Sequence, residues 1–395
     1  MSRGEATALY LARARTLSSY RLHPDDGALS PLAELVMPNV VQSAWAHPRL
    51  PVLYVSCGEP PPGSSVGDWV CAVALDPETG VRGLLGDPVR IAGRALDLTT
   101  DPAGGHLLLA HTRPASISVR RLGPDGTIGE VVEQQTDPGL GVFPHQVRVT
   151  SDGRRCLCVC RGLASPHPWR ASRDPQTEPG SLHVIDLDDG RLGAATTLTL
   201  GDGRHFGPRN LDTDATGTTY YLGLETQNEV VVLSTAAGGR PEPVPRQRLS
   251  TLARPDAEIH QGLGPVLMNP AGTVLYVANR AYQPRPDADR VLPVDAENTV
   301  VVYAVGPRDR LLTEVQRLDS GGVCPRSLSL DLDGRTLVVA NSETYRVGDV
   351  TAAEVAMNLA TFRVRDDGRL EPLARHPVGD GSGAPISWAG LAATS

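Results

Sequence analysis

The sequence predicts an all-β fold, a seven-bladed β-propeller closed by N- and C-terminal strands in one blade. One reason is a repeated unit: a short apolar strand, a tight turn rich in Asp and Gly, a β-branched strand that ends in a polar residue, and a third strand of alternating polarity. Residues 208–211, 217 and 220–233 form one unit, and residues 325–328, 334, 337–341 and 358–362 form another. A repeat of roughly 40 to 50 residues is typical of propellers.

The second reason is that the turns fall into two regular sets. Six lie between the first two strands of a unit, at residues 101–104, 151–153, 215–217, 269–272 and 331–334, with a weaker sixth at 47–49. Seven follow the third strand, at residues 25–27, 78–80, 124–126, 188–190, 237–239, 307–309 and 366–368. Asp-Gly between alternating apolar runs favours a hairpin, because Gly supplies the positive φ that the turn requires.

The unequal turn counts leave one unit without its own first strand. We expect residues 385–388 to supply it by pairing with the N-terminal strands at 9–11 and 17–20. A ring closed in this way has no long open sheet edge. Residues 1–395 are therefore expected to form a single propeller domain.

The composition agrees with a turn-rich β protein. The chain has 41 Gly and 34 Pro, and only residues 1–15 and 349–357 are compatible with a helix. A formal net charge of −8 without a basic run argues against partners such as nucleic acid or a membrane surface. No apolar segment approaches the roughly 18 residues of a membrane-spanning helix, and residues 1–19 lack the apolar block of a signal peptide. These features favour a cytoplasmic protein and leave its oligomeric state open.

The cysteines are expected to be small buried thiols rather than metal ligands. They are Cys57, Cys71, Cys156, Cys158, Cys160 and Cys324. No CxxC pair occurs, so a zinc site is not expected. Cys324 lies two residues before Arg326, but a nucleophilic thiol would need a base beside it. We predict neither a metal nor a cofactor.

Antiparallel geometry places the start of strand one and the end of strand two of each unit on one face of the molecule. Polar residues gather at those places: His145, Arg209 and Arg326 at the starts, and Glu59, His111, Arg161, Glu225, Arg280 and Asn341 at the ends. Three long loops, residues 163–180, 281–298 and 342–357, leave the same face, and loops of this length are often lids. We therefore predict a partly covered, cation-rich pocket for a small anionic substrate.

Several of these residues could instead have structural roles. An Arg that follows Pro at a blade start, such as Arg209 or Arg326, can cap neighbouring carbonyls, and His145 can bridge two blades. Asn341 suits a turn, because Asn readily bonds its own backbone. Glu225 favours a functional site, since an acid that follows a buried strand is costly unless arginines pair with it.

Six motifs in order carry a resemblance to a known family. They are Pro144-His145-Gln146, Gly207-Pro208-Arg209-Asn210-Leu211, Leu224-Glu225-Thr226-Gln227-Asn228, Glu258-Ile259-His260, Tyr276-Val277-Ala278-Asn279-Arg280 and Pro325-Arg326-Ser327-Leu328. This pattern resembles the lactonase family of seven-bladed propellers, which includes the propeller-type 6-phosphogluconolactonase and the fungal 3-carboxy-cis,cis-muconate cyclase. The likeness runs from about residue 54 to residue 364 and is strongest between residues 143 and 341.

The resemblance implies a metal-independent pocket. This pocket would be built from His145, Arg209, Glu225 and Arg280, with Arg326 nearby. Combining the resemblance with the strand geometry, we expect four catalytic residues, His145, Glu225, Arg209 and Arg326, and five substrate-binding residues, Arg280, His260, Asn341, His111 and Arg161. The chain departs from the family pattern at residues 111–113, at residues 160–162 with the insertion after them, and at the extra residues 261–264, which affect the placement of His260. These changes alter the rim more than the centre, so the substrate can differ from a phosphosugar lactone.

Lactone opening needs an activated water and a stabilised oxyanion. Either His145 or Glu225 could take the proton of the water, Arg209 and Arg326 could stabilise the oxyanion, and Arg280 could hold a carboxylate or phosphate of the substrate. Two alternatives remain open. A cycloisomerase would use the same acid and base to close a lactone, and a non-catalytic propeller scaffold would show an exposed apolar patch instead of a convergent site.

Overall fold

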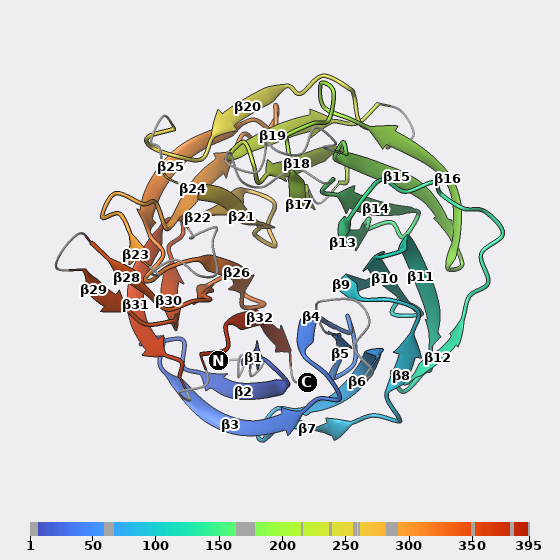
Figure 1. The fold of residues 1–395 in the computed structure, drawn as a ribbon, viewed down its shortest axis with the longest axis horizontal. Helices are drawn as coiled ribbons and strands as arrows, with labels where there is room; N and C mark the ends of the chain where they lie inside the picture. The colour runs from blue at the N-terminus through green and yellow to red at the C-terminus, as the bar shows by residue number, and fades with distance from the viewer. Residues whose placement is uncertain are drawn as a thin grey trace.

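The computed structural model describes residues 7–58, 67–162, 178–214, 216–236, 239–255, 259, 261–281, 291–348, 352–379 and 383–393. Across these residues the strands form seven antiparallel blades around a central axis (Figure 1). The blades are numbered in chain order; in blades 1 to 6 the first strand lies innermost, and in blade 7 the C-terminal strand does. The predicted all-β propeller with seven blades is confirmed.

Blades 1 to 3 contain the N-terminal half of the ring. Blade 1 has β4 (Val41–Ala46), β5 (Val52–Cys57), β6 (Asp68–Asp76) and β7 (Gly80–Leu84), with β8 (Val89–Ile91) paired to β6. Blade 2 has β9 (Ala95–Thr100), β10 (His106–Thr112), β11 (Ala115–Leu122) and β12 (Ile128–Val131). Blade 3 has β13 (Pro144–Val149), β14 (Arg155–Cys160), β15 (Ser181–Asp188) and β16 (Arg191–Leu198).

Blades 4 to 6 continue the ring. Blade 4 has β17 (Pro208–Thr213), β18 (Thr219–Leu224), β19 (Glu229–Ser234) and β20 (Gln247–Ser250). Blade 5 has β21 (Gln261–Met268), β22 (Val274–Ala281), β24 (Thr299–Val305) and β25 (Leu312–Asp319). Blade 6 has β26 (Pro325–Leu330), β27 (Thr336–Asn341), β30 (Asn358–Val364) and β31 (Leu370–Pro377).

Blade 7 joins the two ends of the chain. Its inner strand is β32 (Ile386–Ala393), and its outer strands are β1 (Thr7–Arg13), β2 (Thr16–Leu22) and β3 (Leu29–Val36). β32 runs antiparallel to β1, with Trp388 opposite Ala12. The sequence prediction that the C-terminal strand shares a sheet with the N-terminal strands is therefore confirmed. The two helix-compatible segments contain strands instead: β1 lies within residues 1–15, and β29 (Ala353–Val355) lies within residues 349–357.

The turn between the first two strands repeats one hydrogen-bond device. In four blades a carboxylate or amide Oδ1 accepts hydrogen bonds of 2.6–3.1 Å from two backbone N–H groups across the turn; these residues are Asp101, Asp214, Asn269 and Asp331. Asx side chains readily bond the backbone of a turn in this way. The turn residues that reveal the repeat in the sequence thus form the corresponding turns in the structure.

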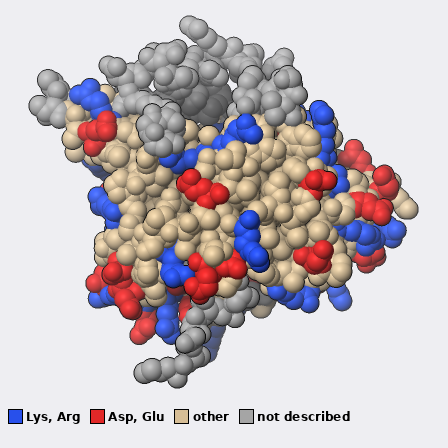
Figure 2. Space-filling model, turned by 90° about the horizontal axis from the view of Figure 1, so that it is seen from below, with Lys and Arg blue, Asp and Glu red and all other residues tan. Residues whose placement is uncertain are grey.

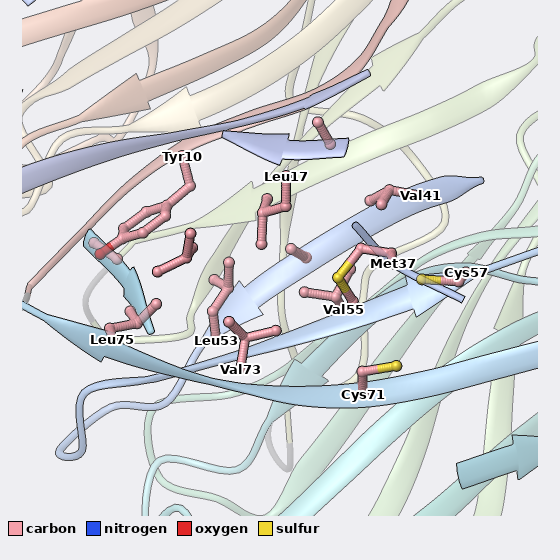
Figure 3. Close-up of a cluster of buried hydrophobic side chains, with 14 of the residues drawn as sticks. Tyr10, Leu17, Met37, Val41, Leu53, Val55, Cys57, Cys71, Val73 and Leu75 are labelled. Atoms are coloured by element: carbon pink, nitrogen blue, oxygen red, sulfur yellow. The ribbon is translucent and has the colours of Figure 1, made fainter. Parts of the chain in front are cut away.

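Apolar clusters join each blade to the next. Among the described residues one cluster lies at each of the seven junctions, including both sides of blade 7. Figure 3 shows the cluster between blades 7 and 1, where Tyr10 and Leu17 pack with Leu53, Val55 and Val73. Burial of such side chains is worth about 1.5–3 kcal/mol each, so the closing junction is built like the other six.

Glutamines on the outer side add polar links between blades. The side-chain amide of Gln247 donates to Leu312 O at 2.9 Å, and its oxygen accepts from Leu312 N at 2.7 Å. Gln316 makes the same pair of bonds to Leu370.

On the face shown in Figure 2, acidic and basic side chains are interspersed. No helix within the described ranges is long and apolar enough to cross a membrane.

Candidate functional site

Three predicted site residues occupy the same structural position in three blades. His145, Arg209 and Arg326 each lie where the register of the innermost pair of strands shifts, so each is the extra residue of a β-bulge. A Pro precedes each of them, and before it stands a residue with positive φ: Phe143 at 61°, Gly207 at 58° and Cys324 at 58°. A bulge leaves its extra residue outside the ladder and re-aims its side chain, which here brings three polar side chains to the axis.

A second group comes from the ends of the second strands. Glu225 follows β18 directly, and its N–H donates to Gly207 O at 2.7 Å. Arg161 follows β14 in the same way, with its N–H bonded to Phe143 O at 2.9 Å. These bonds tie the end of each second strand to the start of its inner strand, and so hold both groups on one face.

Glu225 lies at the centre of an arginine cluster. Its Oε2 accepts a hydrogen bond from Arg161 Nε, its Oε1 accepts one from Arg280 Nη2, and Arg209 Nε lies 3.5 Å from Oε1. The exposed fractions of the side chains are 7% for Glu225, 17% for Arg161, 9% for Arg209 and 5% for Arg280. One buried carboxylate therefore holds three guanidinium groups from three neighbouring blades.

The electrostatics of this cluster favour the charged carboxylate. Burial alone would raise the pKa of Glu225, but the guanidinium groups of Arg161, Arg280 and Arg209 hold that pKa well below its usual range. Burial and the nearby Arg280 lower the pKa of Arg209, which Glu225 only partly offsets. Guanidinium groups remain protonated in proteins, so the cluster keeps an excess of positive charge.

His145 stands beside this cluster as a neutral imidazole. Burial and the charge of Arg209 lower the pKa of His145 well below its usual value. Its Nδ1 is buried without a hydrogen-bond partner in the part of the chain that the structure describes. A neutral histidine next to a positive cluster can accept a proton at neutral pH.

The Glu225 cluster and His145 line one cavity of about 1010 Å³ along the axis of the ring. Of the predicted site residues, His145, Arg161, Arg209, Glu225, Arg280 and Arg326 line it. Its wall also includes polar residues that the sequence reasoning did not select: Gln42, Arg94 and Glu343. Gln42 occupies the bulge of β4, the position that His145 holds in β13. An alignment of the repeats that sets Gln42 at the position of His145 would have identified Gln42 as a candidate.

Two predicted substrate-binding residues lie outside the cavity wall. His111 is buried, with Nδ1 2.7 Å from Gly93 O and Nε2 2.7 Å from Ser118 Oγ. Asn341 is fully buried and bonds Ser320 and Asn358. The contacts of both residues are structural.

A one-residue offset explains both differences. His111 lies opposite Ala95, and Asn341 opposite Pro325, just as Leu224 lies opposite Pro208. The counterparts of Glu225 are thus the next residues, Thr112 and Ser342, whose N–H groups make the equivalent backbone bonds. Successive side chains of a strand point to opposite faces, so a slip of one residue turns a predicted site residue into a core residue.

Other sequence expectations fall on different parts of the chain. His260 and Glu59 lie outside the described residues, as do residues 163–177 and 282–290 of the long loops. Described parts of two of those loops meet in a small sheet, in which β23 (Val291–Leu292) pairs with β28 (Tyr345–Val347) and β28 pairs with β29.

The cysteines are buried and free, as the sequence predicts. Burial raises the pKa of the Cys324 thiol, which disfavours the nucleophilic thiolate. Within the described ranges no group of three or more His, Cys, Asp or Glu side chains has a metal-binding arrangement.

Comparisons with known proteins agree with this architecture. A putative 6-phosphogluconolactonase from Bacteroides fragilis superposes with a TM-score of 0.69 at 18% identity, covering 99% of each chain. The periplasmic gluconolactonase of Pseudomonas aeruginosa superposes with a TM-score of 0.72 at 20% identity, covering 98% of this chain and 99% of the other. No sequence among curated proteins matches significantly. Residues 4–365 match the family model described as Lactonase, 7-bladed beta-propeller, and the chain therefore belongs to that family.

Proposed function

We propose that this protein is a lactonase-like hydrolase that opens the ring of a carboxylated or phosphorylated lactone without a metal ion. The observation that carries the proposal is that His145, with a buried and unpartnered Nδ1 in the described part of the chain, shares a cavity large enough for such a substrate with the cluster of Glu225 and three arginines. Membership of the lactonase family and similarity to a gluconolactonase and a putative 6-phosphogluconolactonase support the same reaction class.

His145 is the better candidate for the general base. The Glu225 carboxylate is occupied by three guanidinium groups and its pKa is well below the usual range, so it is a weak proton acceptor. Neutral His145 can take a proton from water as the water attacks the lactone carbonyl. The protonated imidazole can then return that proton to the ring oxygen as the C–O bond breaks, which yields the ring-opened acid.

Arg209 is the candidate for oxyanion stabilisation. Attack on the carbonyl places a negative charge on its oxygen, and a fixed donor at that point is worth about 2.7–4 kcal/mol. The guanidinium of Arg209 lines the cavity, and Asn210 Oδ1 accepts a 2.7 Å hydrogen bond from its Nη1. Glu225 orients the arginines and offsets part of their repulsion, so its role is to position the donors.

Ring opening of a lactone panel tests this proposal. Glucono-δ-lactone, its 6-phosphate and a carboxylated γ-lactone would be followed by acid release in a pH-stat, with and without EDTA. We expect turnover of an anionic lactone that EDTA does not change. His145→Ala should lower kcat by about a hundredfold, the scale of losing a proton-transfer group.

The control is His23→Ala, which removes a histidine from the loop after β2, outside the cavity wall. Folding of each variant would be checked by circular dichroism. Wild-type kcat in correctly folded His145→Ala would exclude His145 as the base. Formation of a lactone from the open-chain acid, with no ring opening, would assign the cycloisomerase reaction instead.

A further inference from the structure

The cavity holds two arginines that the Glu225 cluster does not neutralise. Six arginines line it, and four of them are paired with carboxylates: Arg148 with Asp97, and Arg161, Arg209 and Arg280 with Glu225. The other two are Arg94 and Arg326. No carboxylate of the described residues forms an ion pair with either, although Asp68 attracts Arg94, and Glu343 and Glu225 attract Arg326, from farther away.

Neutral groups orient both side chains instead. Arg94 Nε donates to Gln42 Oε1 at 2.9 Å and its Nη2 donates to the same oxygen. The Gln42 amide is itself held by Gly58 O at 2.6 Å. Arg326 Nε donates to Ser387 O at 3.2 Å. Each guanidinium thus has a fixed direction while retaining its full positive charge.

These groups belong to blades 6, 7, 1 and 2. Arg326 still lies near the Glu225 cluster, since burial and the charge of Arg280 lower its pKa. Figure 1 shows the inner strands in the order β26, β32, β4 and β9, followed by β13, β17 and β21. Arg326, Ser387 and Gln42 belong to the first three, and Arg94 immediately precedes β9. The Glu225 cluster and His145 belong to blades 3, 4 and 5. The arginines of blades 3, 4 and 5 are therefore partly neutralised by Glu225, whereas Arg94 and Arg326 are oriented by neutral groups.

We propose that Arg94 and Arg326, oriented by Gln42 and Ser387, form an oxyanion-binding subsite for the carboxylate or phosphate of the substrate that does not react. The two arginines repel each other, since the charge of Arg326 lowers the pKa of Arg94. An oxyanion bound between them removes that repulsion and gains charge-assisted hydrogen bonds. Arg280, which the sequence suggested for this role, already shares its charge with Glu225. Arg326, which the sequence suggested for oxyanion stabilisation, is here assigned to the spectator anion instead, and Arg209 alone keeps the oxyanion role.

The subsite orients the substrate within the cavity. With the spectator anion held by Arg94 and Arg326, the lactone ring extends toward His145 and Arg209, which line the same cavity. An anion that keeps its charge throughout the reaction binds equally in the ground state and the transition state. Loss of the subsite that holds it should therefore raise KM and leave kcat nearly unchanged. This kinetic consequence rests on the proposed hydrolase, whereas anion binding to the free protein does not.

Direct binding of inorganic phosphate and of succinate tests the subsite. Isothermal titration at one low, chloride-free ionic strength should show one site for at least one of them. Arg94→Gln and Arg326→Gln should each weaken it about tenfold or more, the scale of one charge-assisted hydrogen bond. Gln42→Glu keeps both arginines and places a carboxylate beside Arg94, so it should abolish binding by internal competition. Arg90→Gln, which removes an exposed arginine near the ring of Trp69 outside the cavity wall, is the control.

Each outcome of the binding experiment either supports or overturns the subsite. Absence of phosphate and succinate binding to the wild type, or unchanged affinity in folded Arg94→Gln and Gln42→Glu, overturns the subsite. Lactone kinetics then separate this result from the fate of the proposed function. Ring opening that Arg94→Gln leaves unaltered rejects the subsite alone. Phosphate binding that depends on Arg94, without turnover of any lactone, rejects the hydrolase and retains the subsite.

Discussion

Replacement of Glu225 by Gln should destabilise the protein and make its stability depend on anions. The change preserves shape but removes the carboxylate that Arg161, Arg209 and Arg280 share. Breaking a buried ion pair by removing one partner costs about 3–5 kcal/mol. The lower end applies here, because the amide oxygen can still accept one hydrogen bond and cavity water reaches Arg161, which is 17% exposed.

A loss of about 3 kcal/mol corresponds to about 4 °C in Tm for a chain of this length, at about 2.1 cal/mol/K of unfolding entropy per residue. Phosphate at about 100 times its Kd would restore about 2.7 kcal/mol, because it can replace the missing charge. The assay is thermal unfolding by circular dichroism at pH 7, with and without phosphate. Phosphate should stabilise Glu225→Gln more than the wild type.

The difference in stability should also depend on pH with a definite sign. The folded-state pKa of Glu225 is depressed, so its contribution is complete above the unfolded pKa of about 4.3 and is lost as the pH falls toward the lower folded pKa. Glu229→Gln is the control, since Glu229 pairs with Arg248 at the surface and such pairs contribute at most about 1 kcal/mol. Equal Tm values for Glu225→Gln and wild type at pH 7, or equal phosphate effects on both, would refute the reasoning.

Two further predictions concern pH and closure of the ring. Because burial and Arg209 lower the pKa of His145, kcat/KM should stay level as the pH falls through about 6.5 and decline only at lower pH. The acid limb of kcat should lie at higher pH, since a bound anion favours the protonated imidazole; coincident limbs would count against His145. Truncation before Ile386 removes β32 and should lower Tm by more than 10 °C, roughly the effect of several lost core side chains. Removal of Thr7 to Leu22 should be equally harmful, and a native Tm in either truncation would contradict closure by blade 7.

The fold could be predicted because its determinants are local and repeated. Each Asp-Gly turn requires a particular backbone geometry, and residues such as Asp101 and Asp331 bond that backbone within five positions of themselves. Even the closing strand follows from counting turns. One blade lacks a first strand at the N-terminal end of the chain, and the C-terminal end has a strand left over. That strand pairs with β1, where Trp388 lies opposite Ala12.

The site was harder to predict because side-chain direction depends on register. Asn341 and Glu225 both stand near the end of a second strand, yet a one-residue offset sends the first into the core and the second into the cavity. Gln42 and Arg94 carry no motif of their own. Their place in the cavity follows from the bulge in β4 and from contact between neighbouring blades, which a linear pattern does not encode.

In the proposed hydrolase, the charges of the cavity would couple substrate binding to the activation of His145 as the base. In the free protein, burial and the positive charge around His145 lower its pKa and weaken it as a proton acceptor. An anionic substrate offsets that positive charge, and opposite charge favours the protonated imidazole, so the basicity of His145 rises when the substrate binds. Glu225 cannot respond in the same way, because its carboxylate is already held by three guanidinium groups. If the protein opens an anionic lactone as proposed, the same arginines would both select that substrate and strengthen the base, whereas a neutral lactone would gain neither effect.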